Sequence, residues 1–272
     1  PCGGWAIYEP GHFQEVISFL FEGAERALLW DTGLGPGDMR ALVESLTRKP
    51  LLVLNSHAHF DHMGGNWRFE TIHAADHPVG LARITRGLSR QATAEHMSPD
   101  QFTSPLPPGF EPAAYEIRGA KVLPLRAGEE LPLGGRTWEV ISTPGHSPDS
   151  LMLLDRENSI LLTGDTFYPA ALYTHLDAGD GQTSDFEVYR ATMRRLARDY
   201  GRVRRLYCSH NEPIAPGEKL RAAAEAFDAV AEGNPPFSVD EKGLRLYEFD
   251  GFSLVVNPSA LSKPQPTGKR GD

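Results

Sequence analysis

The side chains at residues 57–62, HAHFDH, include three imidazoles and one carboxylate, and these groups are common ligands of divalent metal ions. His57 and His59 stand two positions apart, so both point the same way where the chain is extended. Asp61 and His62 follow as the chain turns. Neutral imidazoles with a carboxylate suit Zn²⁺ or a similar ion. Three of the chain's ten histidines fall in this segment, which favours a metal site over a polar surface loop.

The residues on either side of this segment indicate how it is positioned. The apolar run at 51–54 predicts a buried strand, and a loop at the carboxyl end of a strand is where sites form in α/β proteins. Gly64 and Gly65 come next. We expect these glycines to let the backbone approach closely and a helix to begin.

One segment cannot fill two metal sites, so further ligands are expected at later strand ends. Apolar runs at 137–142, 160–163 and 203–208 each predict a strand. Each run is followed within a few residues by a metal-binding side chain, and these are His146, Asp165 and His210. We expect all three to face the same cleft as the first segment.

These motifs, in this order, resemble the metallo-β-lactamase superfamily, whose first ligands have the pattern His-x-His-x-Asp-His. The segment WDTG at 30–33 is similar to an early strand of that family, which ends in a structural aspartate, here Asp31. The resemblance extends over residues 12–215. It implies an α/β fold, a four-layer αββα sandwich with a dinuclear metal site at one edge. We expect one such domain over residues 1–261, and a disordered tail at 262–272, which is polar and contains Pro and Gly.

The resemblance also implies how the ligands divide between two ions. One ion is expected to bind His57, His59 and His146, a second Asp61, His62 and His210, with Asp165 bridging the two. Zinc is the expected metal, and Mn²⁺, Fe²⁺ and Co²⁺ are alternatives. One branch of true β-lactamases has cysteine at the position of Asp165, and the flavodiiron branch has glutamate at that of His59. Membership of either branch is therefore disfavoured for this chain.

The reaction implied by the resemblance is hydrolysis. A water that bridges two cations loses a proton near neutral pH, and the hydroxide attacks the carbonyl of a lactone, ester or thioester, acyl-CoA thioesters included. Asp61 is expected to orient this nucleophile. Tyr168 stands where lactone-hydrolysing members place a tyrosine, and Tyr168 and His175 are candidate donors to the oxyanion. Ordinary packing is the alternative for Tyr168, and a satisfied core position is the alternative for His175.

Other functions found in this superfamily compete with that reading. β-Lactam hydrolysis uses the same chemistry, and glyoxalase II-type hydrolysis is a related option that lacks support because the C-terminal third has no obvious basic cluster. A persulfide dioxygenase-like oxidoreductase uses a single iron, whereas the full ligand set favours two metals. The net charge disfavours a nuclease, and retention of every ligand disfavours a non-catalytic sensor.

The composition limits the partners and the location. A net charge of −9 at pH 7 is unfavourable for binding phosphate backbones, so we predict a small-molecule substrate and no nucleic-acid partner. No run of about 18 apolar residues predicts a membrane span. No segment has the pattern of a signal peptide, so a cytoplasmic protein is expected. The sequence leaves the oligomeric state open.

Further patterns predict the supporting elements. Helices are expected at 38–47, 185–200 and 217–232, and a hairpin at 244–256. The Pro-rich segment 84–116 carries apolar side chains that a plain linker would lack, so it is predicted to pack as a loop or lid. Structural roles are assigned to three other residues with reactive side chains, His73, His77 and Cys208. A surface or turn role is expected for His12, with a place at the cleft as the alternative, and a surface role for His96, with contact to substrate as the alternative.

Overall fold

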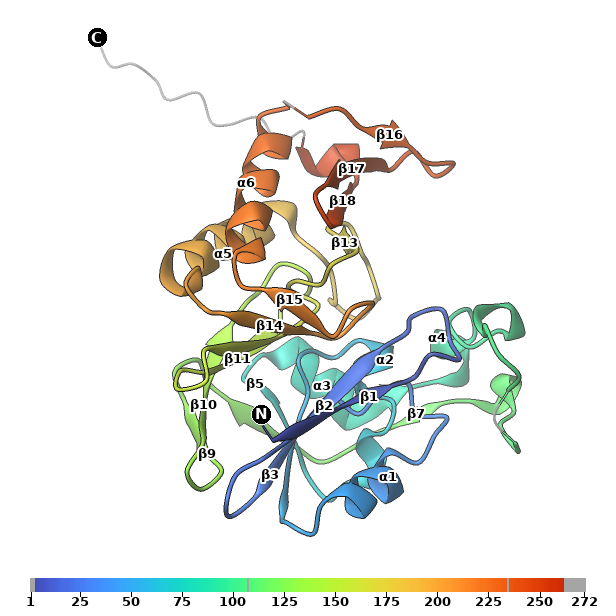
Figure 1. Ribbon diagram of the computed structural model, residues 1–272. Helices are drawn as coiled ribbons and strands as arrows, with labels where there is room; N and C mark the ends of the chain where they lie inside the picture. Colours follow the sequence, from blue (N-terminus) through green and yellow to red (C-terminus); the bar gives the residue numbers. More distant parts are fainter. Residues whose placement is uncertain (1–2, 107, 234, 262–272) are drawn as a thin grey trace.

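The computed structural model describes residues 3–106, 108–233 and 235–261, and two six-stranded sheets form its middle (Figure 1). The N-terminal sheet has the strand order β1 (Gly4–Tyr8), β2 (Ile17–Glu22), β3 (Ala27–Trp30), β4 (Leu51–Leu54), β5 (Ile72–Ala75) and β8 (Val122–Leu125). The C-terminal sheet has the order β15 (Ile214–Pro216), β14 (Arg205–Cys208), β12 (Ile160–Gly164), β11 (Leu151–Asp155), β10 (Thr137–Ser142) and β9 (Glu130–Pro132).

Two smaller sheets complete the strands in the described residues. One has the order β13 (Ala171–Tyr173), β18 (Phe252–Val256), β17 (Arg245–Phe249) and β16 (Ser238–Val239). The other pairs β6 (Gly87–Leu88) with β7 (Ile117–Arg118). Strands β17 and β18 form the predicted hairpin, whose turn places Gly251 at a φ of 74°.

The two large sheets pack face to face through the apolar side chains that alternate strand positions direct inward. Phe19 and Trp30 of the N-terminal sheet share a buried cluster with Trp138 and Leu153 of the C-terminal sheet. Burial of such aromatic side chains is among the largest favourable contributions to folding. The central core of the molecule therefore lies between the sheets.

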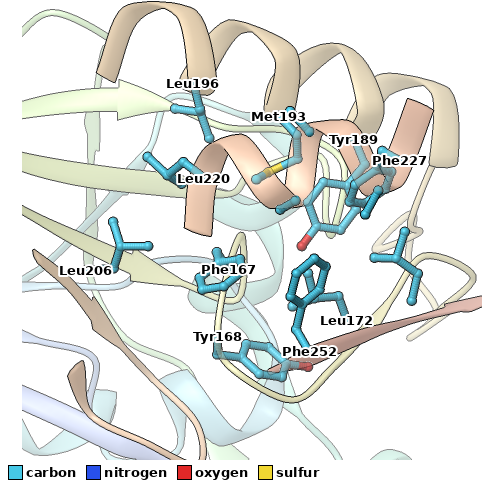
Figure 2. Close-up of a cluster of buried hydrophobic side chains, with 14 of the residues drawn as sticks. Phe167, Tyr168, Leu172, Tyr189, Met193, Leu196, Leu206, Leu220, Phe227 and Phe252 are labelled. Carbon is cyan, nitrogen blue, oxygen red and sulfur yellow. The ribbon is translucent and has the colours of Figure 1, made fainter. Parts of the chain in front are cut away.

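Helices cover the outer face of each large sheet. Helices α1 (Met39–Leu46) and α3 (Pro78–Arg86) bury Val43 and Ile84 on the N-terminal side. Helices α5 (Phe186–Tyr200) and α6 (Lys219–Ala231) pack on each other and on the C-terminal sheet. Figure 2 shows this second core, where Tyr189 and Phe227 of the two helices lie near Phe167. The predicted four-layer αββα sandwich is confirmed.

The strands that carry the candidate ligands end at one edge. Strands β3, β4, β5 and β8 are parallel neighbours, and β12 and β14 are also parallel. The short helix α2 (Phe60–Met63) follows β4 and precedes Gly64, so the prediction that a helix begins after the glycines is wrong. Only a 3₁₀ turn (Asn66–Arg68) follows them. The close approach is confirmed, because a Cβ at Gly64 would lie 2.0 Å from the carbonyl oxygen of Leu34.

Segment 84–116 contains short elements and packs onto the core. It holds the end of α3, strand β6 of the two-stranded sheet, α4 (Arg90–Thr93) and 3₁₀ turns at Pro99–Gln101 and Pro112–Ala114, and the partner strand β7 follows it directly. Phe102, Phe110 and Tyr115 pack against the buried cluster that includes Met63 and Met97. A plain linker would make no such contacts. Its function as a lid stays a prediction.

Two predictions concern the limits of the fold. The tail at 262–272 lies outside the described residues, and the assignment of a single domain stays a prediction. Within the described part of the chain, no helix combines the length and the apolar character needed to span a membrane.

Candidate metal centre

The predicted ligands converge at the edge where β4, β12 and β14 end. Four of them follow β4 around α2, while the others come after β10, β12 and β14. All seven side chains are buried, with exposed fractions between 0% and 7%. The seven are His57, His59, Asp61, His62, His146, Asp165 and His210. The structure therefore brings every predicted ligand together.

Distances divide the seven side chains into overlapping groups of three. The ligand atoms of each group lie within 4.8 Å of one another, and the groups are His57–His59–His146, His57–His62–Asp165 and Asp61–His62–His210. Asp165 lies between the others. Its Oδ1 is 3.1 Å from His210 Nε2 and 3.2 Å from His62 Nε2, and its Oδ2 is 3.4 Å from His146 Nε2. A carboxylate that bridges two ions needs this arrangement.

Unpartnered buried atoms show that these residues fit a metal ion. Three imidazole nitrogens have no hydrogen-bond partner among the described residues, namely Nε2 of His57, Nε2 of His59 and Nδ1 of His146. Each buried polar atom without a partner costs about 1–3 kcal/mol. Imidazole nitrogens with carboxylate oxygens are the donor set of borderline divalent cations. A cation bound here would satisfy atoms that the protein leaves unsatisfied.

The protonation of three histidines suits metal binding. Burial lowers the pKa of His57 and of His59 well below 6.5, and it also lowers the pKa of His146. These imidazoles are therefore neutral at pH 7, and the neutral form is the one that binds a metal.

The other half of the centre is charged in the absence of a cation. Burial opposes a charge on His62 and His210, but nearby carboxylates, Asp165 foremost, outweigh it and raise the pKa of both rings. Burial likewise disfavours the Asp165 carboxylate, and His210 and His62 outweigh it and hold the pKa of Asp165 well below 3.8. A bound cation would stabilise the Asp165 carboxylate in place of the charged rings, and His62 and His210 would release their protons on binding it.

Asp31 orients one of the ligands from behind. It is fully buried and sits at a φ of 64°, directly after β3. Its Oδ2 lies 2.9 Å from His62 Nδ1, and its Oδ1 accepts a hydrogen bond of 2.6 Å from the Ser56 backbone N–H. An acceptor at Nδ1 keeps the proton there and leaves Nε2 to face the centre. The structural role predicted for Asp31 agrees with this geometry.

Two more ligands are held through the nitrogen that faces away from the centre. Ser56 Oγ lies 2.9 Å from His57 Nδ1, and the Gln14 carbonyl oxygen lies 2.7 Å from His210 Nδ1. Gln14 reaches the site from the turn before β2. A sequence pattern gives no indication of this contact, because any residue offers a carbonyl oxygen.

Asp149 is a buried group at the centre that sequence analysis missed. It is 2% exposed, and its Oδ2 accepts a 3.0 Å hydrogen bond from the backbone N–H of Ala58. Its Oδ1 accepts a 2.8 Å bond from Ser147 Oγ. Since Ala58 separates two ligands and Ser147 follows a third, Asp149 ties the two ligand-bearing loops together. An aspartate three residues beyond a candidate ligand was the available signal.

The two candidate oxyanion donors lie in different surroundings. The Tyr168 ring is 5.0 Å from the His210 ring, and its hydroxyl donates a 2.7 Å bond to the Ala171 carbonyl. Burial raises the pKa of Tyr168 well above 10, so its hydroxyl stays a donor. His175 Nδ1 lies 3.2 Å from the Val255 carbonyl oxygen. Within the described residues, Tyr168 contacts a ligand and His175 does not, and both roles in substrate binding stay predictions.

His12 and His96 both lie against Phe60 of the first ligand motif, so the surface roles predicted for them are wrong. The turn role that was the other prediction for His12 agrees with its 3.2 Å hydrogen bond from the Gln14 N–H. His12 is 1% exposed, and its Nε2 lies 2.7 Å from the His96 carbonyl oxygen. The half-buried His96 ring stacks on Phe60 at 4.1 Å with an interplanar angle of 13°. Phe102 packs edge-on against His12 at 5.1 Å. The cause is segment 84–116, which folds back over an apolar residue inside the first ligand motif.

The other three residues that were not predicted to be ligands have the structural roles expected for them. His73 lies on β5 with its Nδ1 3.2 Å from the Val53 carbonyl oxygen, and His77 precedes Pro78, the first residue of α3. Cys208 is fully buried at the end of β14, and burial raises its pKa to about 12, which makes it unreactive.

Comparisons with known proteins agree with this fold. Residues 14–210 match the family model of the Metallo-beta-lactamase superfamily. Acyl-coenzyme A thioesterase MBLAC2 of Gallus gallus is 31% identical over 216 residues, which cover 75% of this chain and 74% of that protein. The protein of the same name from Homo sapiens is 29% identical over 233 residues, or 80% of each chain.

A solved structure supports the same fold. A metallo-beta-lactamase family protein from Thermus thermophilus is similar with a TM-score of 0.60 and 23% identity, and the alignment covers 85% of this chain and 81% of that one. The thioesterase relatives and the grouped metal-binding side chains support an enzyme of the metallo-hydrolase type. Because the family model matches well over half of its length, the chain belongs to the metallo-beta-lactamase superfamily.

Proposed function

We propose that this protein is a thioesterase that hydrolyses acyl-CoA with two divalent metal ions, zinc being the proposed metal. The observation that carries the proposal is the pair of ligand groups, His57–His59–His146 and Asp61–His62–His210, with Asp165 between them. The choice of thioester follows the relatives from Gallus gallus and Homo sapiens, which are named acyl-coenzyme A thioesterases and align over most of the chain.

The ligand groups define what the metal ions would supply. When bound, a pair of divalent cations provides a water of lowered pKa and polarises a substrate carbonyl. The neutral rings of His57, His59 and His146 would hold one ion, and Asp165 would contact both. The protein side chains perform the other tasks, which are to orient, to donate and to shape the pocket.

Asp61 is the proposed orienting carboxylate. Its Oδ2 lies 3.6 Å from both His62 Nε2 and His210 Nε2. The carboxylate is therefore placed to accept a proton from an attacking water and to hold the water's lone pair toward the carbonyl carbon. It would then pass that proton to the departing thiolate of coenzyme A, which completes the hydrolysis to a free acid and a thiol.

Tyr168 is the proposed donor to the carbonyl oxygen of the substrate. Its hydroxyl now donates to the Ala171 carbonyl, and its ring lies against His210. A thioester bound beside His210 would offer a second acceptor, and the acceptor becomes stronger as negative charge develops on the oxygen in the transition state. His175 is a weaker candidate, since its contact is with Val255.

The acyl group is proposed to lie under segment 84–116. A pocket of about 190 Å³ beside His12 is lined largely by apolar side chains, namely Leu34, Pro36, Phe102 and Pro105. Apolar lining suits the hydrocarbon part of a ligand and contributes affinity in proportion to the area removed from water. This pocket favours an acyl substrate over a small polar one.

A hydrolysis screen tests the proposal. The zinc-loaded protein is offered short- and long-chain acyl-CoA, an acyl-homoserine lactone, a p-nitrophenyl ester and a chromogenic cephalosporin. Thiol released from acyl-CoA is detected with a disulfide reagent, the ester and the cephalosporin are followed by absorbance, and lactone opening is followed by the acid that it releases. We expect the highest kcat/KM with acyl-CoA and no turnover by Asp165→Ala. A preference for the lactone or the cephalosporin would refute the thioesterase assignment.

A further inference from the structure

A groove of about 550 Å³ lies on the outside of the molecule, at the end of α3 that is remote from the metal centre. It is bounded by Arg86, by Gly87–Ser89 at β6, by Arg118 on β7 and by Asp180 in the loop before α5. Nothing in the proposed hydrolysis uses these residues. The groove is large enough to hold a substantial polar group.

Arginine side chains give this groove a basic character in an otherwise acidic chain. Arg86 and Arg118 line it together with Glu116 and Asp180. Arg83 lies 3.7 Å from Asp180 and Arg90 lies 3.8 Å from Glu116, so four arginines surround two carboxylates. The Arg118 guanidinium lies over the Trp67 ring at 4.7 Å, which fixes its position and leaves the N–H edge available. The net charge of the chain is −9, so a concentration of arginines at one groove needs a local reason.

Segment 87–96 connects this groove to the metal centre. Its first three residues line the groove, and its last residue, His96, stacks on Phe60 between the ligands His59 and Asp61. The protein chain itself therefore runs from the groove to the first ligand motif.

Helix α3 provides a second, parallel connection. A Cβ at Gly80 would lie 2.2 Å from Asp149 Oδ2, so the start of the helix packs on the residue that ties the ligand loops together. Arg86 lies six residues further, or about 9 Å along the helix axis. The groove therefore lies further along α3 than the contact with Asp149, a separation that an extended arm of a ligand could bridge.

The opposite wall of the groove is fixed to this helix. Arg83 donates a 2.9 Å hydrogen bond to the Ala178 carbonyl, and Arg86 forms a 2.5 Å ion pair with Asp180. Asp180 sits at a φ of 54° and its carboxylate is about half exposed. Its oxygen occupies a position beside Arg86 where an anion on a ligand would also bind.

We propose that this groove binds the phosphate groups of coenzyme A, with Arg86 and Arg118 as their ligands, while the pantetheine arm runs along segment 87–96 to the metal centre. The inference rests on the proposed thioesterase function and adds the part of the substrate that the metal centre cannot recognise. Guanidinium groups bind phosphate oxygens through two parallel charge-assisted hydrogen bonds, which makes arginine the favoured residue for this task.

The test compares two substrates that share a thioester and differ in the phosphates. The double variant Arg86→Ala/Arg118→Ala is assayed with an acyl-CoA and with the matching acyl-pantetheine, which lacks the nucleotide and every phosphate. We expect KM for acyl-CoA to rise by about tenfold or more, given the strength of hydrogen bonds to charged groups. The kcat, and both parameters for acyl-pantetheine, should stay unchanged.

A matched control has the same loss of charge at another groove. Arg40 and Arg48 are exposed and line a groove of similar volume, about 550 Å³, at the opposite end of β4. The double variant Arg40→Ala/Arg48→Ala should leave KM for acyl-CoA unchanged. Asp180→Asn keeps a residue that tolerates a positive φ and removes the competing carboxylate, so it should lower KM for acyl-CoA.

The outcomes separate the inference from the proposed function. Equal KM values for acyl-CoA in the parent and the Arg86/Arg118 variant, or an equal rise for both substrates, would overturn the groove assignment. Adenosine 3′,5′-bisphosphate, which has no thioester, tests the groove without catalysis, and its binding should weaken in the same variant. Arginine-dependent binding of this nucleotide by a protein that hydrolyses neither thioester would overturn the thioesterase function and keep the groove. Binding that is independent of both arginines would overturn the groove.

Discussion

Replacement of Asp31 by Asn should weaken metal binding through the tautomer of one ligand. The carboxylate lies 2.9 Å from His62 Nδ1, and both side chains are completely buried. Asn keeps an oxygen for the Ser56 N–H and tolerates the φ of 64°. Its amide then faces Nδ1 as a donor, so the ring proton moves to Nε2, the nitrogen that a metal needs.

The size of this effect follows from the contact that is lost. Loss of the hydrogen-bond acceptor at the second ring nitrogen of a metal-binding histidine lowers metal affinity by about 10–100-fold, or roughly 1.4–2.8 kcal/mol. The loss should fall on the ion held by Asp61, His62 and His210, and the ion held by the other group should be retained. Zinc titration in competition with a chromophoric chelator resolves two dissociation constants and assigns the loss to one of them.

A matched variant separates this effect from a general loss of stability. Asp155 is also a buried aspartate, 1% exposed, and its carboxylate lies 2.8 Å from Arg136 Nε, in the C-terminal sheet. Asp155→Asn should lower the melting temperature and leave both zinc constants unchanged. Unchanged zinc constants in Asp31→Asn, or an equal loss in the two variants, would refute the tautomer argument.

Three further predictions concern groups around the centre. Asp149→Ala removes the acceptor for Ala58 and should weaken zinc binding by about tenfold, whereas Asp149→Asn should restore most of it; equal affinities in parent and Ala variant would contradict the positioning role. Tyr168→Phe should lower kcat for acyl-CoA by about 10–100-fold with the metal content unchanged, and an unaltered kcat would assign the tyrosine to packing. Burial raises the pKa of Glu9 from 4.5 to about 7, so the metal-free parent should lose stability as pH rises through this interval. Glu9→Gln should not lose stability in this interval, and it should gain about 3 kcal/mol relative to the parent between pH 4.5 and 8. Parallel stability curves for parent and variant would show that the pKa of Glu9 is not raised.

Much of the site could be predicted because its residues follow strands with strong apolar patterns. The run 51–54 forms β4 with the predicted bounds, and β10 also has the predicted bounds. Each ligand then lies within a few residues of a strand end. Because parallel strands bring their carboxyl ends to one edge, chain order and strand prediction suffice to group the ligands. The helices at 38–47 and 185–200 were predictable because their apolar residues recur every three or four positions.

The parts that could not be predicted depend on contacts between distant segments. His12 and His96 are 84 positions apart, and neither has a periodic pattern that indicates burial. No helix was predicted at the position of α3, because a proline inside a segment usually ends a helix. Pro78 instead stands at the first helical position, where its missing N–H costs nothing. Asp149 was overlooked because its partner, the Ala58 N–H, is a backbone group that any residue carries.

The measurement that tests the central claim most directly is the metal content of the protein purified without added metal or chelator. Elemental mass spectrometry on the parent and on Asp165→Ala gives ions per chain, and acyl-CoA turnover is recorded on the same samples. The account predicts about two divalent ions per parent chain with thioester hydrolysis, and fewer ions without hydrolysis in the variant, since Asp165 lies between both ligand groups. One iron per chain with no hydrolysis, or full metal content and activity in the variant, would contradict a dinuclear hydrolase.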